Sequence, residues 1–108
     1  MRVELLWWEG CPSHPEALAE LKQVLREQGI DPDTVELVEI VDDAQAEREG
    51  FFGSPTIRID GEDILQPGEG DPVGLSCRVY RLRDGGPSPV PDLEDVRDAV
   101  RRRAYAAG

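Results

Sequence analysis

The sequence predicts an α/β domain with a mixed sheet of about four strands and about three helices. One observation is the order of three segments: an apolar run at residues 3–8, an amphipathic helical pattern, and a run rich in β-branched residues at 35–41. That order is typical of a parallel βαβ unit. The other observation is the Asp60-Gly61 pair, a strong hairpin signal that adds antiparallel strands.

A buried central strand followed by a helix is predicted near the start of the chain. The run at residues 3–8 is short and mostly apolar, as a strand inside a sheet requires. Ser13 and Glu16 have the spacing of a capping box, so the helix is expected to begin at about His14. Its apolar residues recur with the helical period until Gly29 marks its end, which predicts one face packed on the sheet.

A second strand, a short helix and a hairpin are predicted next. Residues 35–41 are apolar and β-branched, which favours a strand. Residues 42–49 have the pattern of a short polar helix. Residues 56–59 predict a third strand, which turns at Asp60-Gly61 into residues 62–65.

Residues 66–91 predict a loop-rich insertion within a single domain that spans residues 1–108. Gly and Pro account for eleven of the 31 residues from 61 to 91, which argues against a long helix there. Residues 75–82 alternate well enough to predict a further strand inside this region. A last helix with a narrow apolar face opens at Asp92.

The charge of the chain restricts its partners. It has 12 basic and 23 acidic residues, a formal net charge of −11 at pH 7. Phosphate backbones and anionic lipids would repel such a protein, so we expect neither a nucleic acid nor a membrane partner. The first residues lack the pattern of a secretory signal, which makes the cytoplasm the expected location. Two cysteines in that reducing compartment indicate catalysis, metal binding or burial rather than a structural disulfide.

Cys11 is the strongest candidate for a reactive group, because it lies between the first strand and the first helix. A helix start stabilises a thiolate and lowers a cysteine pKa from about 8.5 to roughly 3.5–7.5. His14, one turn further, is a candidate proton partner for that thiolate. Cys77 fits two roles equally, a resolving thiol or a cysteine that fills the core beside Leu75 and Val79.

The motifs around these cysteines resemble a known fold. A cysteine motif between the first strand and helix, with a proline directly before the third strand, looks like the thioredoxin fold, a three-layer α/β/α arrangement. Three motifs in order are similar to small bacterial thioredoxin-like proteins, some of them selenoproteins and some labelled as alkylmercury lyases. They are Gly10-Cys11-Pro12, Gly53-Ser54-Pro55-Thr56, and Gly-Leu-Ser-Cys-Arg-Val-Tyr at residues 74–80.

This resemblance implies a site. Pro55 would be cis and face Cys11, and the Ser54 backbone would be exposed and able to pair with an extended substrate. Pro12 is also expected to contact substrate. Independently of the resemblance, alternation along the first strand predicts Trp7 in the core and Trp8 at the rim of the site, in contact with substrate; a purely structural role for either is the alternative. Dithiol thioredoxins have a second cysteine where this chain has His14, so either Cys77 or a small external thiol would resolve the mixed disulfide.

Three functions follow from these residues. The first is a thiol-disulfide oxidoreductase that acts on a protein or small-molecule thiol or disulfide through Cys11. The second is a protein that binds a soft metal or an organomercurial through Cys11 and Cys77. The third is a redox-silent adaptor that binds peptides at Pro55. The sequence indicates no cofactor and no structural metal site, since Cys11 and His14 lack the second ligand pair of a zinc site.

Overall fold

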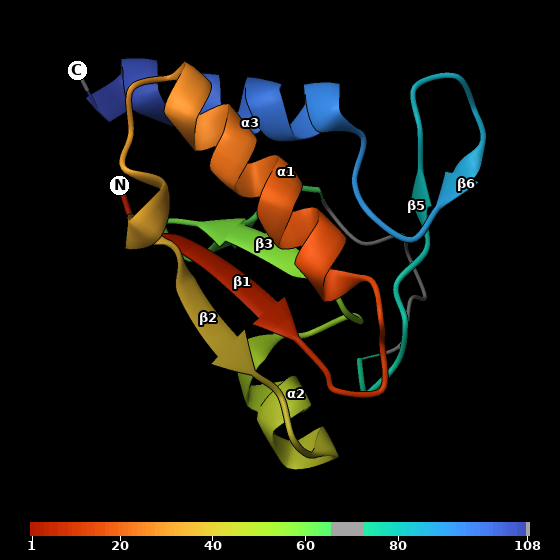
Figure 1. Cartoon of the computed structure of the whole chain (residues 1–108). Helices are drawn as coiled ribbons and strands as arrows, with labels where there is room; N and C mark the ends of the chain where they lie inside the picture. Colours follow the sequence, from red (N-terminus) through yellow and green to blue (C-terminus); the bar gives the residue numbers. More distant parts are fainter. Residues whose placement is uncertain (66–72, 108) are drawn as a thin grey trace.

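Four strands form a mixed sheet in the order β2-β1-β3-β4 (Figure 1). The computed structural model describes residues 1–65 and 73–107. β1 (Val3–Trp7) pairs in parallel with β2 (Glu36–Glu39) and antiparallel with β3 (Thr56–Ile59), which continues into β4 (Glu62–Asp63). The internal position of the first strand, the parallel crossover and the hairpin are therefore confirmed.

Three α-helices connect or follow these strands. They are α1 (His14–Glu27), α2 (Asp43–Glu49) and α3 (Leu93–Ala107), and a short 3-10 helix, η1 (Pro32–Thr34), precedes β2. The Asp42 carboxylate caps α2 by accepting a hydrogen bond from the N–H of Gln45, as an N-cap aspartate should. The capping box expected at Ser13 is wrong, because the Ser13 hydroxyl makes no capping bond to α1.

Each face of β1 packs against its own hydrophobic cluster. Alternate strand residues point to opposite faces, so Val3 and Leu5 meet α1 and α3, which lie together over one face of the sheet (Figure 1). Leu6 points the other way and packs with Ile40, Ala46 and Phe51, which come from the end of β2 and from α2 and its C-terminal end. The point where β1 leaves the sheet therefore lies between two packed layers of side chains.

The predicted strand at residues 75–82 is wrong in extent and in the sense of its alternation. Only β5 (Tyr80–Arg81) is a strand there, and it pairs with β6 (Pro87–Ser88) outside the main sheet. Arg78 and Tyr80 are buried, whereas Val79 is 74% exposed and Cys77 is exposed. The side chains that face inward are thus the polar ones, Arg78 and Tyr80. Their burial is possible because residues elsewhere in the fold form hydrogen bonds with them. The first part of the predicted loop, residues 66–72, lies outside the described residues.

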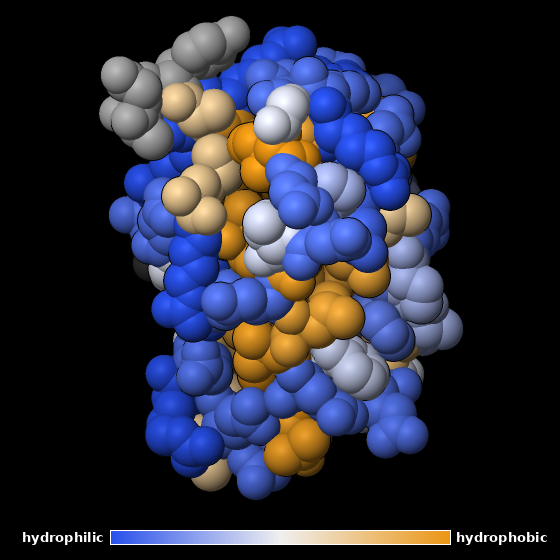
Figure 2. Space-filling model, turned by 60° about the vertical axis from the view of Figure 1, so that its left-hand side comes forward, coloured by the Kyte–Doolittle hydropathy of each residue, from blue (hydrophilic) through white to orange (hydrophobic). Residues whose placement is uncertain are grey.

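The edge strand β2 leaves apolar side chains uncovered. Leu37 and Val41 are more than half exposed. Figure 2, which brings the left-hand side of Figure 1 forward, shows hydrophobic side chains in a band among hydrophilic ones. Glu36 and Glu39 on the same strand carry charge, which disfavours pairing of this edge with another strand.

Within the described ranges, no helix combines the length and the apolar character needed to cross a membrane.

Candidate dithiol site

Cys11 lies in a tight turn between β1 and α1. Its N–H donates a hydrogen bond to the carbonyl of Trp8 at 3.0 Å. Gly10 occupies this turn because a Cβ at that position would overlap the Trp8 indole ring. The turn buries the Cys11 side chain, which is 1% exposed. The Gly10-Cys11-Pro12 motif therefore forms a turn that buries the Cys11 thiol close to the start of α1.

Donors around Cys11 stabilise its thiolate. Burial raises the pKa of Cys11, but the N–H of Ser13, the thiol of Cys77 and the hydroxyls of Ser54 and Ser13 donate to the sulfur, and the net effect lowers that pKa below its ordinary value. When protonated, the Cys11 Sγ donates to the carbonyl oxygen of Ser54 at 3.3 Å. The activation expected of Cys11 is thus carried by specific donors at the helix start and across the site.

The proline motif lies against Cys11. The Ser54–Pro55 peptide bond is cis, as the resemblance implied. The motif contacts the cysteine through Ser54. Its carbonyl accepts a hydrogen bond from the Cys11 thiol, and its side chain is fully buried. The Ser54 hydroxyl has no hydrogen-bond partner among neutral groups of the described residues, so the Cys11 thiolate is the acceptor within its reach.

The backbone N–H and carbonyl of Ser54 are already hydrogen-bonded to another segment of the chain, residues 76–78. The Ser54 N–H donates to the Ser76 carbonyl at 2.8 Å, and the Arg78 N–H donates to the Ser54 carbonyl at 2.9 Å. Together these bonds form an isolated parallel β-bridge between Ser54 and Cys77. The expectation of an exposed Ser54 backbone is therefore wrong, because residues 76–78 already fill the place of an added strand.

Gly53 permits this close approach. Its φ is +124°, a conformation that other residues rarely adopt. A Cβ there would lie 3.0 Å from both the backbone nitrogen and the Cβ of Arg78. Glycine is thus required both by the backbone angle and by the neighbouring segment.

The bridge places Cys77 beside Cys11. Both cysteines are free thiols, Cys11 buried and Cys77 exposed. The Cys77 thiol donates a hydrogen bond to the Cys11 sulfur, which raises the pKa of Cys77, and burial and the charge on Cys11 raise it further. The core-filling role considered for Cys77 is wrong, because its side chain is exposed, and the two cysteines are neighbouring free thiols.

Arg78 fixes the segment that contains Cys77, residues 76–78, to the β3–β4 hairpin and the residues after it. Its guanidinium forms an ion pair with Asp63 at 2.7 Å and donates to the Leu65 carbonyl at 2.7 Å and to Thr56 Oγ1 at 3.2 Å. The same group lies over the Tyr80 ring, 4.7 Å from its centroid. This arginine points inward, not to solvent, and its partners come from β3 and the segment that follows it.

Tyr80 ties the same segment to the cis proline. Its hydroxyl donates a hydrogen bond to the carbonyl of Pro55. Burial raises the pKa of Tyr80, so the phenol stays protonated and remains a donor. Our sequence reasoning missed Arg78 and Tyr80 as site residues. Arg78 and Tyr80 are two residues apart, with Val79 between them. In an extended segment this spacing places both side chains on the same face, which is the sequence signal for their joint role.

His14 is turned to the backbone, not to the sulfur. Its Nδ1 lies 3.2 Å from the carbonyl oxygen of Cys11, and its ring stacks on Trp7 with centroids 4.3 Å apart. His14 is also not among the groups that shift the pKa of Cys11. Its expected place as proton partner of the thiolate is therefore not supported by its contacts, which fix the first turn of α1.

Both tryptophans are half-buried, on opposite sides of the end of β1. Trp7 is half-buried and stacks on His14 at the start of α1. Trp8 packs against the second cluster of the core, on the face of β1 that meets α2. The cause is the two-residue period of the strand, which puts Trp8 on the side of Leu6. Pro12 is exposed beside Cys11, where an approaching molecule can contact it.

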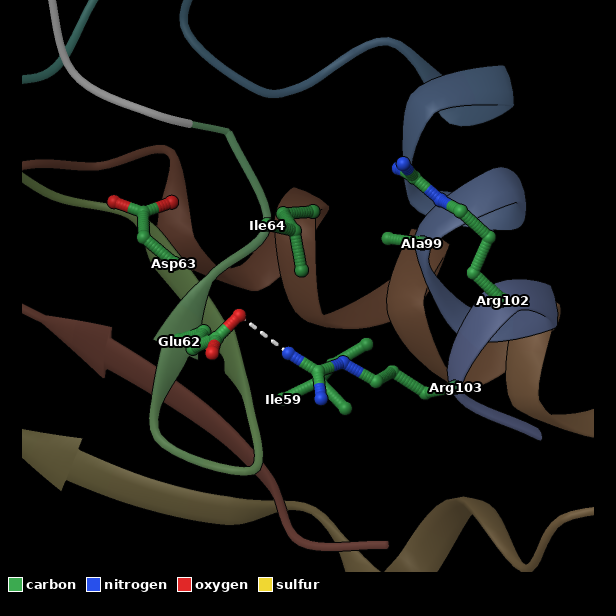
Figure 3. A pocket seen from close by; sticks show the side chains of 7 residues that line it. All are labelled: Ile59, Glu62, Asp63, Ile64, Ala99, Arg102 and Arg103. Carbon is green, nitrogen blue, oxygen red and sulfur yellow. Dashed lines mark hydrogen bonds and ion pairs between the residues drawn. The ribbon is translucent and has the colours of Figure 1, made fainter. Parts of the chain in front are cut away.

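A cavity away from the two cysteines has no thiol or imidazole in its lining. It has a volume of about 300 Å³ and lies between the β3–β4 hairpin and α3 (Figure 3). Glu62 and Arg103 form an ion pair across it, as Figure 3 shows, and no thiol or histidine lines it. Among the residues that the structure describes, no group of three or more His, Cys, Asp or Glu side chains is arranged to hold a metal ion.

The described residues thus bring together Cys11, Ser54, Pro55 and Cys77 and leave His14 and Trp8 outside the contacts of the sulfur. In comparisons with known proteins, no protein-family model, no curated protein and no solved structure matches this chain.

Proposed function

We propose that this protein is a thiol-disulfide oxidoreductase with a thioredoxin-like fold, in which Cys11 and Cys77 alternate between two thiols and one disulfide. The observation that carries the proposal is the nearness of the two cysteines: the Cys11 Sγ donates to the Ser54 carbonyl, and Ser54 forms a β-bridge with Cys77. Two neighbouring thiols form a disulfide on losing two electrons and two protons, provided that their Cα atoms come within about 4.4–6.8 Å of each other.

The electrostatics of the pair support exchange chemistry. A thiolate, not a thiol, attacks a disulfide, and a thiolate of low pKa is also the better leaving group. The donors around Cys11 lower its pKa, whereas the hydrogen bond to Cys11 raises that of Cys77. The pair is therefore asymmetric, with the negative charge on the inner sulfur.

The surroundings of the pair support the thioredoxin-like reading. The cysteine follows a strand inside the sheet and precedes a helix, and a cis proline opens β3 beside it. We place the protein in the cytoplasm, with a protein or small-molecule thiol or disulfide as its partner. A nucleic acid or membrane partner is not proposed, given the net charge of −11.

A catalytic assay tests this proposal. The wild-type protein is added in trace amount to a fluorescence-quenched peptide disulfide in the presence of dithiothreitol. We expect faster release of the fluorescent thiol than with the reductant alone, and loss of that acceleration in both Cys11→Ser and Cys77→Ser. Glu47→Gln, at an exposed residue of α2 that leaves both thiols in place, is the control and should retain the acceleration. Equal rates with wild type and with both cysteine variants would refute the proposal.

A second function has one observation in its favour. Two adjacent sulfurs are a suitable donor set for copper(I) or mercury(II), which prefer soft thiolate ligands. Native mass spectrometry after addition of one equivalent of mercury(II) separates this function from the first, since it requires retained metal in the wild type and loss of metal in Cys77→Ser. The adaptor function gains no support, because residues 76–78 occupy the strand position at Ser54.

A further inference from the structure

We propose that external thiols and disulfides exchange with this protein at Cys77, through an apolar groove, and that Cys11 is an inner cysteine that reacts only with Cys77. The inference rests on the proposed function and adds the order of attack and the class of substrate. It departs from the sequence-based expectation that Cys11 attacks the substrate directly.

Access to the two sulfurs carries the order of attack. Thiol-disulfide exchange needs an incoming sulfur in direct contact with the sulfur under attack. Cys11 is 1% exposed, and its sulfur lies against the fully buried Ser54. Cys77 is exposed, and its β-bridge with Ser54, whose carbonyl accepts the Cys11 thiol, places it beside Cys11. An external molecule therefore meets Cys77 first, and Cys11 meets Cys77 alone.

The anchoring of the segment keeps this geometry. Arg78 and Tyr80, next to Cys77 in the chain, hold the segment to Asp63 and to the Pro55 carbonyl. Ser54 holds it from the other side through two backbone hydrogen bonds. Cys77 is thus presented at the surface by a fixed backbone, and its exposure does not require the segment to leave.

The groove beside Cys77 indicates what kind of molecule binds. A depression of about 280 Å³ is lined by Cys77, Arg78, Val79, Pro87, Ser88 and Pro89. The Arg78 guanidinium is directed into its bonds with Asp63 and the Leu65 carbonyl, so it offers the groove no free charge. Val79 and the two prolines leave an apolar lining, in contrast to the acidic character of the whole chain.

Such a lining selects uncharged, apolar groups next to the reacting sulfur. Apolar groups gain free energy when they leave water for this groove, whereas a carboxylate would lose hydration without a cation to pair with. The substrate class is therefore a thiol or disulfide with uncharged, apolar flanking groups, which excludes an acidic thiol as the preferred partner.

The reaction of the oxidised protein follows from this order. An external thiolate attacks Cys77 Sγ, a new sulfur–sulfur bond forms, and the Cys11–Cys77 bond breaks with its electron pair on Cys11. The donors around Cys11 make it the better leaving group. A second external thiolate then attacks the sulfur of the bound thiol and releases Cys77. Two external thiols become one disulfide, and their two protons and two electrons pass to the cysteines.

The reverse sequence reduces an external disulfide. Cys77 passes its proton to Cys11, and the resulting Cys77 thiolate attacks one sulfur of the disulfide and expels the other half as a thiolate, which then takes the proton from Cys11. The Cys11 thiolate then attacks Cys77 Sγ, which releases the second half and closes the internal disulfide. In both directions the mixed disulfide is on Cys77, which is the point that an experiment can test.

Single-cysteine variants measure access without any internal disulfide. Cys11→Ser and Cys77→Ser are each treated with 2,2′-dithiodipyridine, a neutral disulfide, and the release of pyridine-2-thione is followed. We expect Cys77 in Cys11→Ser to react at least about tenfold faster than Cys11 in Cys77→Ser, and the difference to vanish in urea. Equal native rates, or a faster Cys11, would overturn the order of attack.

A mapping experiment on the wild type provides the independent measurement. The oxidised protein is exposed to benzyl mercaptan, quenched in acid and digested, and the adduct should lie on Cys77, with Cys11 free. An adduct on Cys11 would overturn the order. If the wild type forms no internal disulfide, the proposed function fails, while the variant rates still decide which cysteine is accessible.

The substrate class is tested with a matched pair of thiols. Benzyl mercaptan and its 4-carboxylate analogue are compared as reductants of the oxidised wild type at low and at high salt. We expect the apolar thiol to react faster in both, since salt screens the net charge of the protein but not the apolar groove. Loss of the preference at high salt would overturn the substrate class.

Discussion

Ser54 and Cys77 form an isolated parallel β-bridge, and this bridge brings the thiol of Cys77 to the thiol of Cys11. The same Ser54 carbonyl accepts hydrogen bonds from the Arg78 N–H and from the Cys11 thiol. A single residue beside the cis proline therefore positions both sulfurs. In this molecule the strand position next to that proline holds a cysteine of the same chain.

Replacement of Gly53 should separate the two thiols. In Gly53→Ala, the new Cβ would lie 3.0 Å from the Arg78 backbone and the φ of +124° would be strained, at a cost of roughly 1–3 kcal/mol. We expect a smaller fraction of internal disulfide in a dithiothreitol redox buffer. Gly61→Ala is the matched control, because its φ is +83° with no atom near the new Cβ. An equal shift in both variants would show that strain alone, not the segment, is responsible.

Loss of Arg78 should destabilise the fold strongly. Arg78→Met leaves the Asp63 carboxylate without its cation, and the two side chains are only 8% and 14% exposed. Removal of one partner of a buried pair costs about 3–5 kcal/mol, which urea unfolding would measure. Arg81→Met, at an exposed arginine of β5, should change the free energy of unfolding by less than about 0.5 kcal/mol. Addition of Asp63→Asn to Arg78→Met should recover part of the loss, because no buried charge then remains.

Ser54→Ala should make Cys11 less acidic without destabilising the protein. The Ser54 hydroxyl is buried and lacks a neutral partner among the described residues, yet it lowers the pKa of Cys11. Its removal should raise the pKa of Cys11, while the free energy of unfolding stays level or rises, since an unsatisfied buried group costs about 1–3 kcal/mol. Thiolate absorbance against pH, in a Cys77→Ser background, measures the first effect.

Two further variants calibrate that measurement. Ser13→Ala should raise the pKa of Cys11 less than Ser54→Ala does, because the N–H of Ser13 is a stronger donor than its hydroxyl and remains in place. His14→Phe should leave the pKa of Cys11 unchanged, since the His14 ring contacts the Cys11 carbonyl and Trp7. A large shift in His14→Phe would restore histidine as the proton partner.

Tyr80 should make the protein sensitive to alkaline pH. Burial raises the pKa of Tyr80 in the folded state above the value of about 10 that a tyrosine has in an unfolded chain. The unfolded state therefore loses this proton first. The contribution of Tyr80 to the free energy of unfolding is complete below about pH 10 and is lost as the pH rises toward the folded pKa.

Tyr80→Phe isolates this contribution. The variant should lose about 1 kcal/mol at neutral pH, because the hydrogen bond to the Pro55 carbonyl is gone. Its free energy of unfolding should decline less than that of the wild type above about pH 10. Parallel declines in the two proteins would mean that another group titrates.

Local signals were sufficient to predict the main elements. The hairpin at Asp60-Gly61 depends on residues within one turn, so it can be recognised without the rest of the fold. α1 does begin at His14, although the capping bond expected of Ser13 does not form. The internal position of β1 follows from its apolar residues, which pack on both faces. The cis bond before Pro55 came from the resemblance, not from any local rule.

Long-range partners explain what the sequence could not indicate. Hydropathy favours Leu75 and Val79 as the inward residues, but Arg78 is buried because Asp63, fifteen residues earlier, neutralises it. No pattern along the chain indicates that Ser54 pairs with the Cys77 segment, since that pairing depends on how β3 is placed. Spacing alone brings His14 to Cys11, whereas the contacts of its ring are with Trp7, on which it stacks, and with the Cys11 carbonyl.

The most direct test of the central claim is the intact mass of the oxidised protein, measured on the denatured monomer with its reduced form beside it. A reversible Cys11–Cys77 pair predicts the loss of two hydrogen atoms on oxidation, restored by dithiothreitol and absent in Cys11→Ser and in Cys77→Ser. An unchanged mass in the oxidised wild type, or the same loss in either single variant, would contradict it.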